Sequence, residues 1–526
     1  MDYPVESFSD EERALLAPHF TNLDRPVFAL VNLPETVKGA MFARYSRYQG
    51  TLRRLYLEEF AHERAAAEPF EGAEGERARR LYERIFLGYG DDSVAQLGGA
   101  HVACEWVSNV MTKLLQRGRL AAYLEQSTRY IPYDTPMGAG LGYRYWRDPA
   151  LGPEYERAMD HLFDAYAESL PRVEAWAAGR FPRADGEPAA AHRRSIRAKA
   201  LDLLRGLLPA ASLSHVGIFA TGQAYEQLLL RLSASPLPEA RDYAGMILAE
   251  LRAVMPSFVA RVGRADRGGE WIAYLEERER AADRWAARLG LGRADGSGPA
   301  VRLLTVQGSE EELLAALVFE AATCSEEDAR SAVRNLPPDE RATMLRDLVG
   351  RRRNRRHRPG RGFEALRYRF EVISDYGAFR DLQRHRMLTA QWQTLGPDLG
   401  AGVPDELDEV GVGDRYREGL ERSRAEHARI VELGRPELAP YALCLGYRIR
   451  YVLDMNAREA MHVIELRSGR EGHPAYRAVA HALHAEIAHV HPAVAAAMTF
   501  VDRDTEPRLE RILSEIRAHA RQRARA

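Results

Sequence analysis

The chain has few cysteines, no long apolar run and almost no net charge. Its 526 residues include three cysteines, Cys104, Cys324 and Cys444, which lie far apart and form no CxxC pair. This spacing argues against a disulfide framework and a zinc-finger pattern, so we expect reduced thiols that are buried as small hydrophobic side chains. No run of about 18 apolar residues occurs, and we expect no membrane span. A formal net charge of −2 argues against a general polyanion binder.

The rest of the composition is that of an ordinary globular protein. Hydrophobic residues make up 46% and charged residues 29% of the chain. The length suffices for two to four domains with a large buried core. The first residues are acidic and polar and lack the basic start and apolar run of a signal peptide, so we expect a cytoplasmic protein.

Two similar segments suggest an internal repeat. The apolar runs 27–34 and 301–306 are each typical of a strand and are each followed by a helix-like segment. Residues 292–299 form a cluster of Gly, Ser, Pro and Asp that is typical of a linker. We therefore predict a first unit at 1–290, a linker at 291–300 and a second unit at 301–526. The predicted fold class is mixed α+β, with two helix-rich tandem units and a small sheet in each.

One motif occurs twice, each time incompletely. The first copy, Arg117-Gly118-Arg119, is followed after seven residues by Ser127-Thr128-Arg129-Tyr130. The second copy, Arg384-His385-Arg386, is followed after the same seven residues by Thr394. Two guanidiniums can bind a phosphate or pyrophosphate bidentately, and a His between them can donate a further hydrogen bond. The alternative for a lone basic tripeptide is a solvated helix end.

The motif resembles the signature of flavin-dependent thymidylate synthases, which runs Arg-His-Arg, seven residues, Ser, and then Arg-Tyr. Residues 456–467 are similar to the family's C-terminal helix, which starts Asn-Ala-Arg and ends Leu-Arg, and Gly472-His473-Pro474 lies downstream. The resemblance implies the family's fold in both units. It also implies that FAD is bound by Arg384, His385, Arg386, Asn456, Arg458, His462 and His473.

The same resemblance implies a nucleotide site. Its substrate-binding residues are Glu125, Ser127, Arg129, Tyr130, Arg231 and Arg467. Ser127 and Arg467 are the two assigned to catalysis, with Ser127 as a substrate ligand because no His/Asp partner is placed to make it a nucleophile. The structural alternatives are a helix N-cap for Asn456, exposed helix charges for Arg458 and Arg467, and an ordinary turn at 125–130.

Each copy departs from the family pattern, and the losses are complementary. Gly118 replaces the His in the first copy, whereas Thr394 replaces the Ser and Trp392 the Glu in the second. Family members are homotetramers with sites built from different subunits. We therefore expect sites assembled from both units, within a homodimer of tandem chains. The alternative is that both copies of the motif have lost their function.

The activity implied by the resemblance is the reductive methylation of dUMP to dTMP. Methylenetetrahydrofolate and NADPH are the implied co-substrates and FAD is the cofactor. A same-fold flavin or nucleotide enzyme with a changed substrate remains an alternative, as does a non-catalytic nucleotide- or nucleic-acid-binding homologue. The chain has no separate GxGxxG dinucleotide motif, so NADPH would bind transiently at the flavin site.

Two further clusters of charged residues could form binding sites. Residues 351–361 contain seven arginines, but no aromatic residues interleave with them, so we expect a phosphate-facing or solvated loop and no nucleic acid partner. Asp91-Asp92-Ser93 lacks a nearby His or third acid, so we predict no metal there and expect Ser93 to start a helix.

Overall fold

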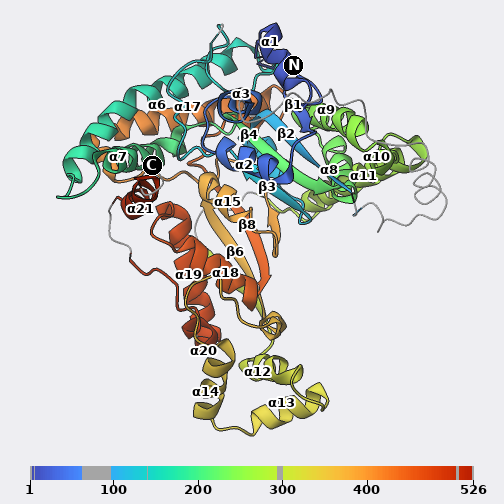
Figure 1. The fold of residues 1–526 in the computed structure, drawn as a ribbon, viewed down its shortest axis with the longest axis vertical. Coiled ribbons are helices and arrows are strands. Elements are labelled where there is room, and N and C mark those ends of the chain that lie inside the picture. The colour runs from blue at the N-terminus through green and yellow to red at the C-terminus, as the bar shows by residue number, and fades with distance from the viewer. Residues whose placement is uncertain are drawn as a thin grey trace. The chain divides into compact units, whose positions relative to one another are not determined.

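The computed structural model describes residues 3–4, 6–61, 96, 98–138, 140–292, 300–504 and 509–523 (Figure 1). The fold is α+β, as predicted, and the chain forms two compact units. Unit 1 comprises Met1–Ser169, Leu207–Ala294 and Arg415–Cys444, and unit 2 comprises Leu170–Gly206, Asp295–Asp414 and Leu445–Ala526. The predicted helix start at Ser93 and the linker residues 293–299 lie outside the described residues, so the division at 291–300 stays a prediction.

Unit 1 contains a four-stranded antiparallel sheet. Its strands are β1 (Val27–Leu30), β2 (Gly99–Ser108), β3 (Ala121–Glu125) and β4 (Leu213–Thr221), in the order β1-β2-β4-β3. Strands β2 and β4 are buried almost throughout, which is why they are apolar on both faces and show little alternation in the sequence.

Unit 2 contains a second sheet with the same topology. Its strands are β5 (Val301–Gln307), β6 (Arg367–Asp375), β7 (Thr389–Trp392) and β8 (Arg448–Asn456), in the order β5-β6-β8-β7 and again antiparallel. Strands β6 and β8 alternate buried and less buried residues, because one face packs on helices and the other does not. The repeated strand order confirms the predicted pair of small sheets.

Helices surround each sheet. Those of unit 1 are α1 (Asp10–Leu16), α2 (Glu35–Tyr45), α3 (Leu52–Glu59), α5 (Asn109–Leu115), α8 (Gly222–Ser233), α9 (Pro238–Val254), α10 (Pro256–Val259) and α11 (Glu270–Arg288). Those of unit 2 are α7 (Ala189–Leu204), α12 (Glu310–Phe319), α13 (Glu326–Arg334), α14 (Pro338–Val349), α15 (Tyr376–Leu382), α16 (Glu406–Val410), α18 (Ala457–Arg467), α19 (Pro474–Val490), α20 (Pro492–Ala496) and α21 (Ile512–Arg523). Two further helices, α6 (Gly152–Arg180) and α17 (Gly413–Glu432), run through a unit boundary.

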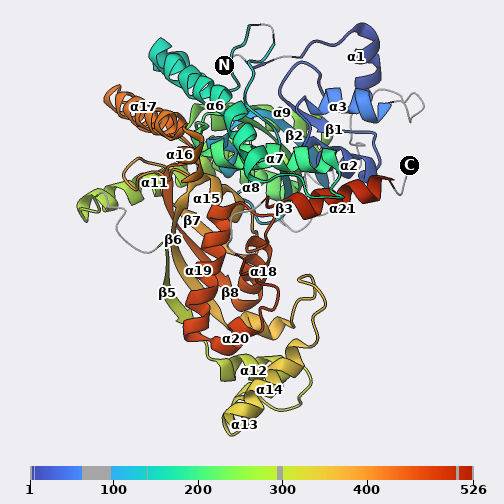
Figure 2. The same ribbon diagram turned by 90° about the vertical axis from the view of Figure 1, so that its left-hand side faces the viewer.

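A helix pair follows β4 in unit 1 and β8 in unit 2. In unit 1, α8 and α9 bury Tyr225 and Ile247 in a core cluster with the sheet residues Val102 and Ile218. In unit 2, α18 lies against β8 and α19 lies against β5 and β6 (Figure 2). None of the described helices is both long and apolar enough to cross a membrane.

The two units can be compared position by position, because equivalent side chains cap equivalent helices. Ser108 caps α5 after β2, and Asp375 caps α15 after β6. The first arginine of each motif copy follows its cap by nine residues, so 117–119 corresponds to 384–386. Two of the cysteines are buried as expected, but Cys324 is exposed, so that expectation was wrong for the third thiol.

Candidate functional site

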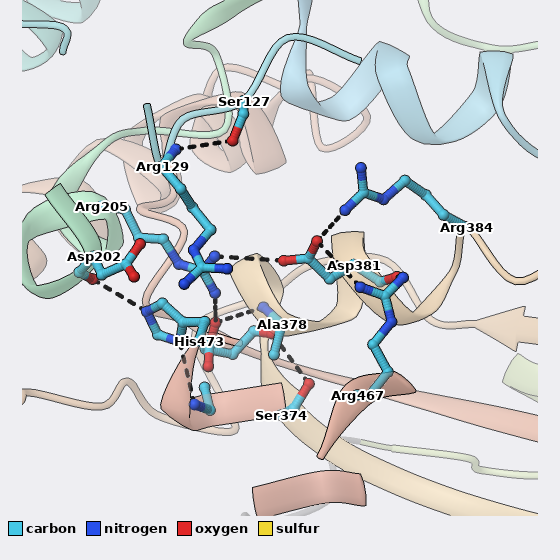
Figure 3. A network of polar contacts seen from close by, with 12 residues as sticks. Ser127, Arg129, Asp202, Arg205, Ser374, Ala378, Asp381, Arg384, Arg467 and His473 are labelled. Carbon is cyan, nitrogen blue, oxygen red and sulfur yellow. Dashed lines mark hydrogen bonds and ion pairs between the residues drawn. The ribbon is translucent and has the colours of Figure 1, made fainter. Parts of the chain in front are cut away.

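Three guanidiniums of unit 2 converge on the carboxylate of Asp381, near the end of α15 (Figure 3). Arg384 donates to Asp381 Oδ1, and Arg205 Nη1 lies 3.5 Å from Oδ2. Arg467, from the last turn of α18, donates from Nη2 to the Asp381 carbonyl oxygen at 2.6 Å. Asp375 Oδ1 also lies 3.7 Å from Arg205 Nη2, and two carboxylates against three cations still leave the cluster positive, which suits an anionic ligand.

His385, the central residue of the motif, is held by the same arginine. Arg467 Nε donates to His385 Nε2 at 2.9 Å, so this nitrogen is an acceptor and the ring proton resides on Nδ1. His385 Nδ1 lies 3.5 Å from Glu459 Oε1. Burial, with Arg467 as the next cause, holds the pKa of His385 well below its ordinary value. The motif therefore presents a neutral imidazole with one defined tautomer.

Arg467 is largely enclosed. Its side chain is 14% exposed, and its guanidinium lies over the Tyr476 ring, 5.4 Å from the centroid. The alternative reading of Arg467 as an exposed helix charge is therefore wrong. Hydrogen bonds to Asp381 of α15 and to His385, three residues beyond the end of that helix, preorganise the guanidinium before any ligand binds.

Two titratable residues of α18 lie beside His385. Burial raises the pKa of Glu459 to about 7, against the opposing effect of Arg358 and Arg458. Burial lowers the pKa of His462 to about 4, and Arg358 and Arg355 add to that shift. Near pH 7 both imidazoles of this cluster are therefore neutral, and Glu459 is about half protonated.

His385, Glu459 and His462 are also a possible metal-ligand set. Their ligand atoms lie within 4.8 Å of one another, and two His with one Glu is a set that zinc enzymes use. However, a metal on His385 Nδ1 would place the proton on Nε2, where it would face the N–H of Arg467. Arginines also surround the cluster. The donor set does not suit a cation, and we assign no metal to it.

Three predicted cofactor residues have clear structural contacts. Asn456 caps α18 by accepting from Glu459 N at 2.9 Å, as its structural alternative predicts. Arg458 Nε donates to the Pro359 carbonyl at 2.9 Å. His473 caps α19, and its Nε2 lies 3.1 Å from the Asp202 carbonyl. These contacts position the site's helices, and their predicted cofactor roles remain predictions.

The arginine run 351–361 divides into one structural residue and several exposed ones. Arg352 forms a buried pair with Glu465 and donates to the His357 carbonyl. The other arginines of the run are exposed. Of these, Arg355 and Arg358 lie close enough to His462 to shift its pKa, so part of the run faces the His385 cluster.

In unit 1, the predicted nucleotide segment starts with a buried anchor. The Glu125 carboxylate accepts from Lys113 Nζ at 3.0 Å and from Gln116 Nε2 at 2.8 Å, and it is 6% exposed. Trp392 holds the equivalent place in unit 2 and packs on Phe379, with centroids 5.5 Å apart. One unit thus uses a buried ion pair where the other uses an aromatic contact.

The rest of the segment is a turn with accessible polar groups. Arg129 N donates to Ser127 Oγ at 3.2 Å (Figure 3), and Ser127 N donates to the Ser46 carbonyl at 3.1 Å. Tyr130 is exposed, and the Arg47 guanidinium lies 4.5 Å from its ring centroid. The turn reading of this segment is correct as a description of its backbone, and the turn leaves Ser127 and Arg129 half-buried and Tyr130 exposed.

In unit 1, a histidine at the centre of the motif would have to displace the Tyr123 hydroxyl. A Cβ on Gly118 would lie 2.7 Å from the Tyr123 hydroxyl, which donates to the Gly118 carbonyl. Arg231 Nη2 would lie 3.6 Å from the same Cβ. In unit 2 the position of Tyr123 is Ala390, which leaves space for His385. The sequence analysis did not identify the paired difference between Tyr123 with Gly118 in unit 1 and Ala390 with His385 in unit 2. A residue-by-residue comparison of the two motif copies would have found it.

Comparisons with known proteins find relatives along the whole chain. A family model described as thymidylate synthase complementing protein matches residues 40–257 and 305–493. A UPF0159 protein of Chlamydia muridarum (strain MoPn / Nigg) is 36% identical over 98% of this chain and 99% of its own length. A UPF0159 protein of Thermoplasma acidophilum is 31% identical over 92% of this chain and 99% of its own. The crystal structure of a UMP/dUMP methylase, PolB from Streptomyces cacaoi, bound with 5-Br dUMP, matches 39% of this chain and 97% of that one, with 22% identity and a TM-score of 0.31.

Proposed function

The chain belongs to the thymidylate synthase complementing protein family, and on this premise we propose that it is a flavin-dependent thymidylate synthase. The proposed reaction is the reductive methylation of dUMP to dTMP, with methylenetetrahydrofolate as carbon donor and NADPH as reductant. The observation that carries the proposal is the hydrogen-bonded set of His385, Arg467 and Asp381, which combines a neutral imidazole with a preorganised guanidinium.

The residues of unit 2 fit FAD as the cofactor. Its diphosphate needs cationic donors, and the exposed Arg355 and Arg358 lie beside the neutral His462. Arg384, His385 and Arg386 would hold the rest of the cofactor together with His462. When bound, the flavin supplies the hydride for the pyrimidine. The protein side chains orient the two reactants and balance their charge.

The nucleotide would be recognised by Arg467 and by the turn of unit 1. A guanidinium with two of its donors already committed presents its remaining N–H groups in a defined direction, which suits a pyrimidine carbonyl or a phosphate. Ser127, Arg129 and Tyr130 supply a hydroxyl, a cation and an aromatic ring for the same ligand. We assign Glu125 a positioning role, because its carboxylate is engaged by Lys113 and Gln116.

Only one copy of the motif can hold the cofactor under this proposal. Tyr123 fills in unit 1 the space that His385 uses in unit 2, so unit 1 keeps the tail of the motif and unit 2 keeps the head. Because the two motif copies supply complementary parts of the site, the proposal requires one flavin site in each chain and not two.

Visible absorption of the purified chain tests the proposal. After incubation with FAD and desalting, we expect retained flavin bands that shift when dUMP is added, followed by dTMP formation with methylenetetrahydrofolate and NADPH. Arg386→Ala should lose flavin, whereas the matched unit 1 variant Arg119→Ala should retain it. Flavin that does not respond to dUMP would favour a changed substrate, and no retained flavin would overturn the proposal.

A further inference from the structure

Helix α11 of unit 1 carries an exposed aromatic stripe. Trp271, Tyr274, Trp285 and Leu289 are 43%, 60%, 55% and 63% exposed. At 3.6 residues per turn their spacing of three, fourteen and eighteen residues from Trp271 places them on one face of the helix and its C-cap. Large exposed apolar side chains in one line mark an interaction surface more often than scattered single residues do.

Among the described residues, helix α11 is supported along one side, and Arg278 and Glu279 lie close enough to Arg117 to affect its pKa. Ile272 and Leu275 pack against the unit 1 core, but no residue of α11 is buried. The later turns are held by exposed ion pairs within the helix, such as Arg284 with Glu277. Isolated helices of this length are marginal in water, so an apolar stripe that the described part of the chain leaves exposed indicates a partner that covers it.

The charges of α11 point to the identity of that partner. Residues 270–279 carry four acids and one arginine, whereas residues 280–288 carry three arginines and one acid. An antiparallel copy of the same helix places the acidic half of one chain against the basic half of the other, whereas a parallel copy would place like charges together. We propose that α11 pairs antiparallel with α11 of a second copy of this chain, about a twofold axis near residue 280.

The antiparallel pairing also brings the apolar stripes of the two copies together. In the antiparallel arrangement Trp271 of one copy lies opposite Leu289 of the other, and Tyr274 lies opposite the turn that carries Trp285. The small residue Ala282 and the flexible Arg278 occupy the middle of the face, where two helices must approach closely. The contact is isologous, so it closes as a dimer and does not propagate.

Paired charge reversals test the association of the full chain by sedimentation velocity. Glu276→Arg with Glu277→Arg makes both halves basic, and Arg284→Glu with Arg288→Glu makes both halves acidic. Each variant alone should self-associate at least tenfold more weakly than the wild type, and an equal mixture should regain wild-type association. Leu433→Asp, at an exposed apolar residue elsewhere in unit 1, should change nothing.

Site-directed cross-linking tests the orientation. In a Cys324→Ser background, where the remaining thiols are buried, Ala282→Cys should cross-link to a second copy with a short bismaleimide. Glu270→Cys should not, because an antiparallel pair separates the two positions by about 30 Å. Cross-linking at both positions would indicate a parallel pair. No cross-link at 282, or charge variants that associate like the wild type, would overturn the proposal.

Discussion

Arg467 donates from Nε to His385 Nε2 at 2.9 Å, which joins the last turn of α18 to the central residue of the Arg-His-Arg motif. The same guanidinium reaches the Asp381 carbonyl through Nη2. One arginine therefore fixes the tautomer of the histidine and is itself fixed by the turn that carries the motif. The proposed cofactor and nucleotide sites share this residue.

Replacing Arg467 should weaken nucleotide binding. Arg467→Ala removes a charge-assisted donor, and we expect a loss of about 2 kcal/mol, or roughly 30-fold in affinity for dUMP, measured by calorimetry. Arg467→Lys should recover only part of this, because an ammonium cannot keep the forked contacts to His385 and Asp381. Arg231→Ala in unit 1 is the comparison, because the sequence also assigns Arg231 to the substrate. A larger loss at Arg231 than at Arg467 would reverse our assignment of the nucleotide site.

Restoring the histidine of the unit 1 motif should destabilise the protein. Gly118→His forces a side chain against the Tyr123 hydroxyl, and overpacking of this kind costs about 1 to 3 kcal/mol. The double variant Gly118→His with Tyr123→Ala copies the unit 2 pair and should recover most of the loss, as measured by urea unfolding. No recovery in the double variant would mean that Tyr123 is not the obstacle.

The converse exchange in unit 2 should remove the cofactor without unfolding the chain. Ala390→Tyr places a phenol where His385 has its space, so we expect flavin retention to fall at least tenfold. Ala390→Ser adds one small polar atom at the same position and should retain flavin, which separates the effect of bulk from that of substitution. The measurement is flavin absorbance after desalting, with circular dichroism as the check on folding.

Glu459→Gln should make stability less sensitive to pH. Burial raises the pKa of Glu459 from 4.5 to about 7, so the folded state binds this proton more tightly than the unfolded chain does. In the wild type, the contribution of Glu459 to the free energy of unfolding is fully present below pH 4.5. It is lost as the pH rises toward 7. Because the glutamine of the variant cannot ionise, its free energy of unfolding should exceed that of the wild type by about 3 kcal/mol at high pH. The two proteins should be equally stable at low pH.

Urea unfolding at several pH values measures this difference. The opposite shift of His462 is present in both proteins and cancels in the comparison. Glu327→Gln, at a side chain that is 74% exposed, is the control and should show no such trend. A constant difference between Glu459→Gln and the wild type at all pH values would contradict the assigned pKa.

Glu125→Ala should be among the most damaging substitutions in unit 1. It removes the carboxylate that pairs with the buried Lys113 ammonium, and breaking a buried ion pair in this way costs about 3 to 5 kcal/mol. Removing both charges, with Glu125→Leu and Lys113→Met, should cost less than the single change. If Glu125 instead binds the nucleotide, the double variant would fold normally but lose dUMP affinity, and calorimetry would show it.

The local features of this chain could be read from its sequence because they depend on short-range patterns. The helix pairs after β4 and β8 follow from apolar spacing at three and four residues. The strand starting at Val301 follows from its branched and apolar residues. The duplicated motif, and through it the family, follow from the order of a few residues at fixed spacing, which needs no knowledge of distant contacts.

Contacts between distant segments decided the rest. The sequence identifies Arg467 and His385 as site residues, but their hydrogen bond joins residues 82 positions apart and depends on where the fold of unit 2 places the last turn of α18. Glu125 looks like a ligand in the motif and is an ion-pair partner in the fold, because a charged residue that is buried must find its counter-charge. Tyr123 has no signature at all. Its role exists only because its hydroxyl occupies the volume beside Gly118, and volume is a property of the packed structure that no local pattern encodes.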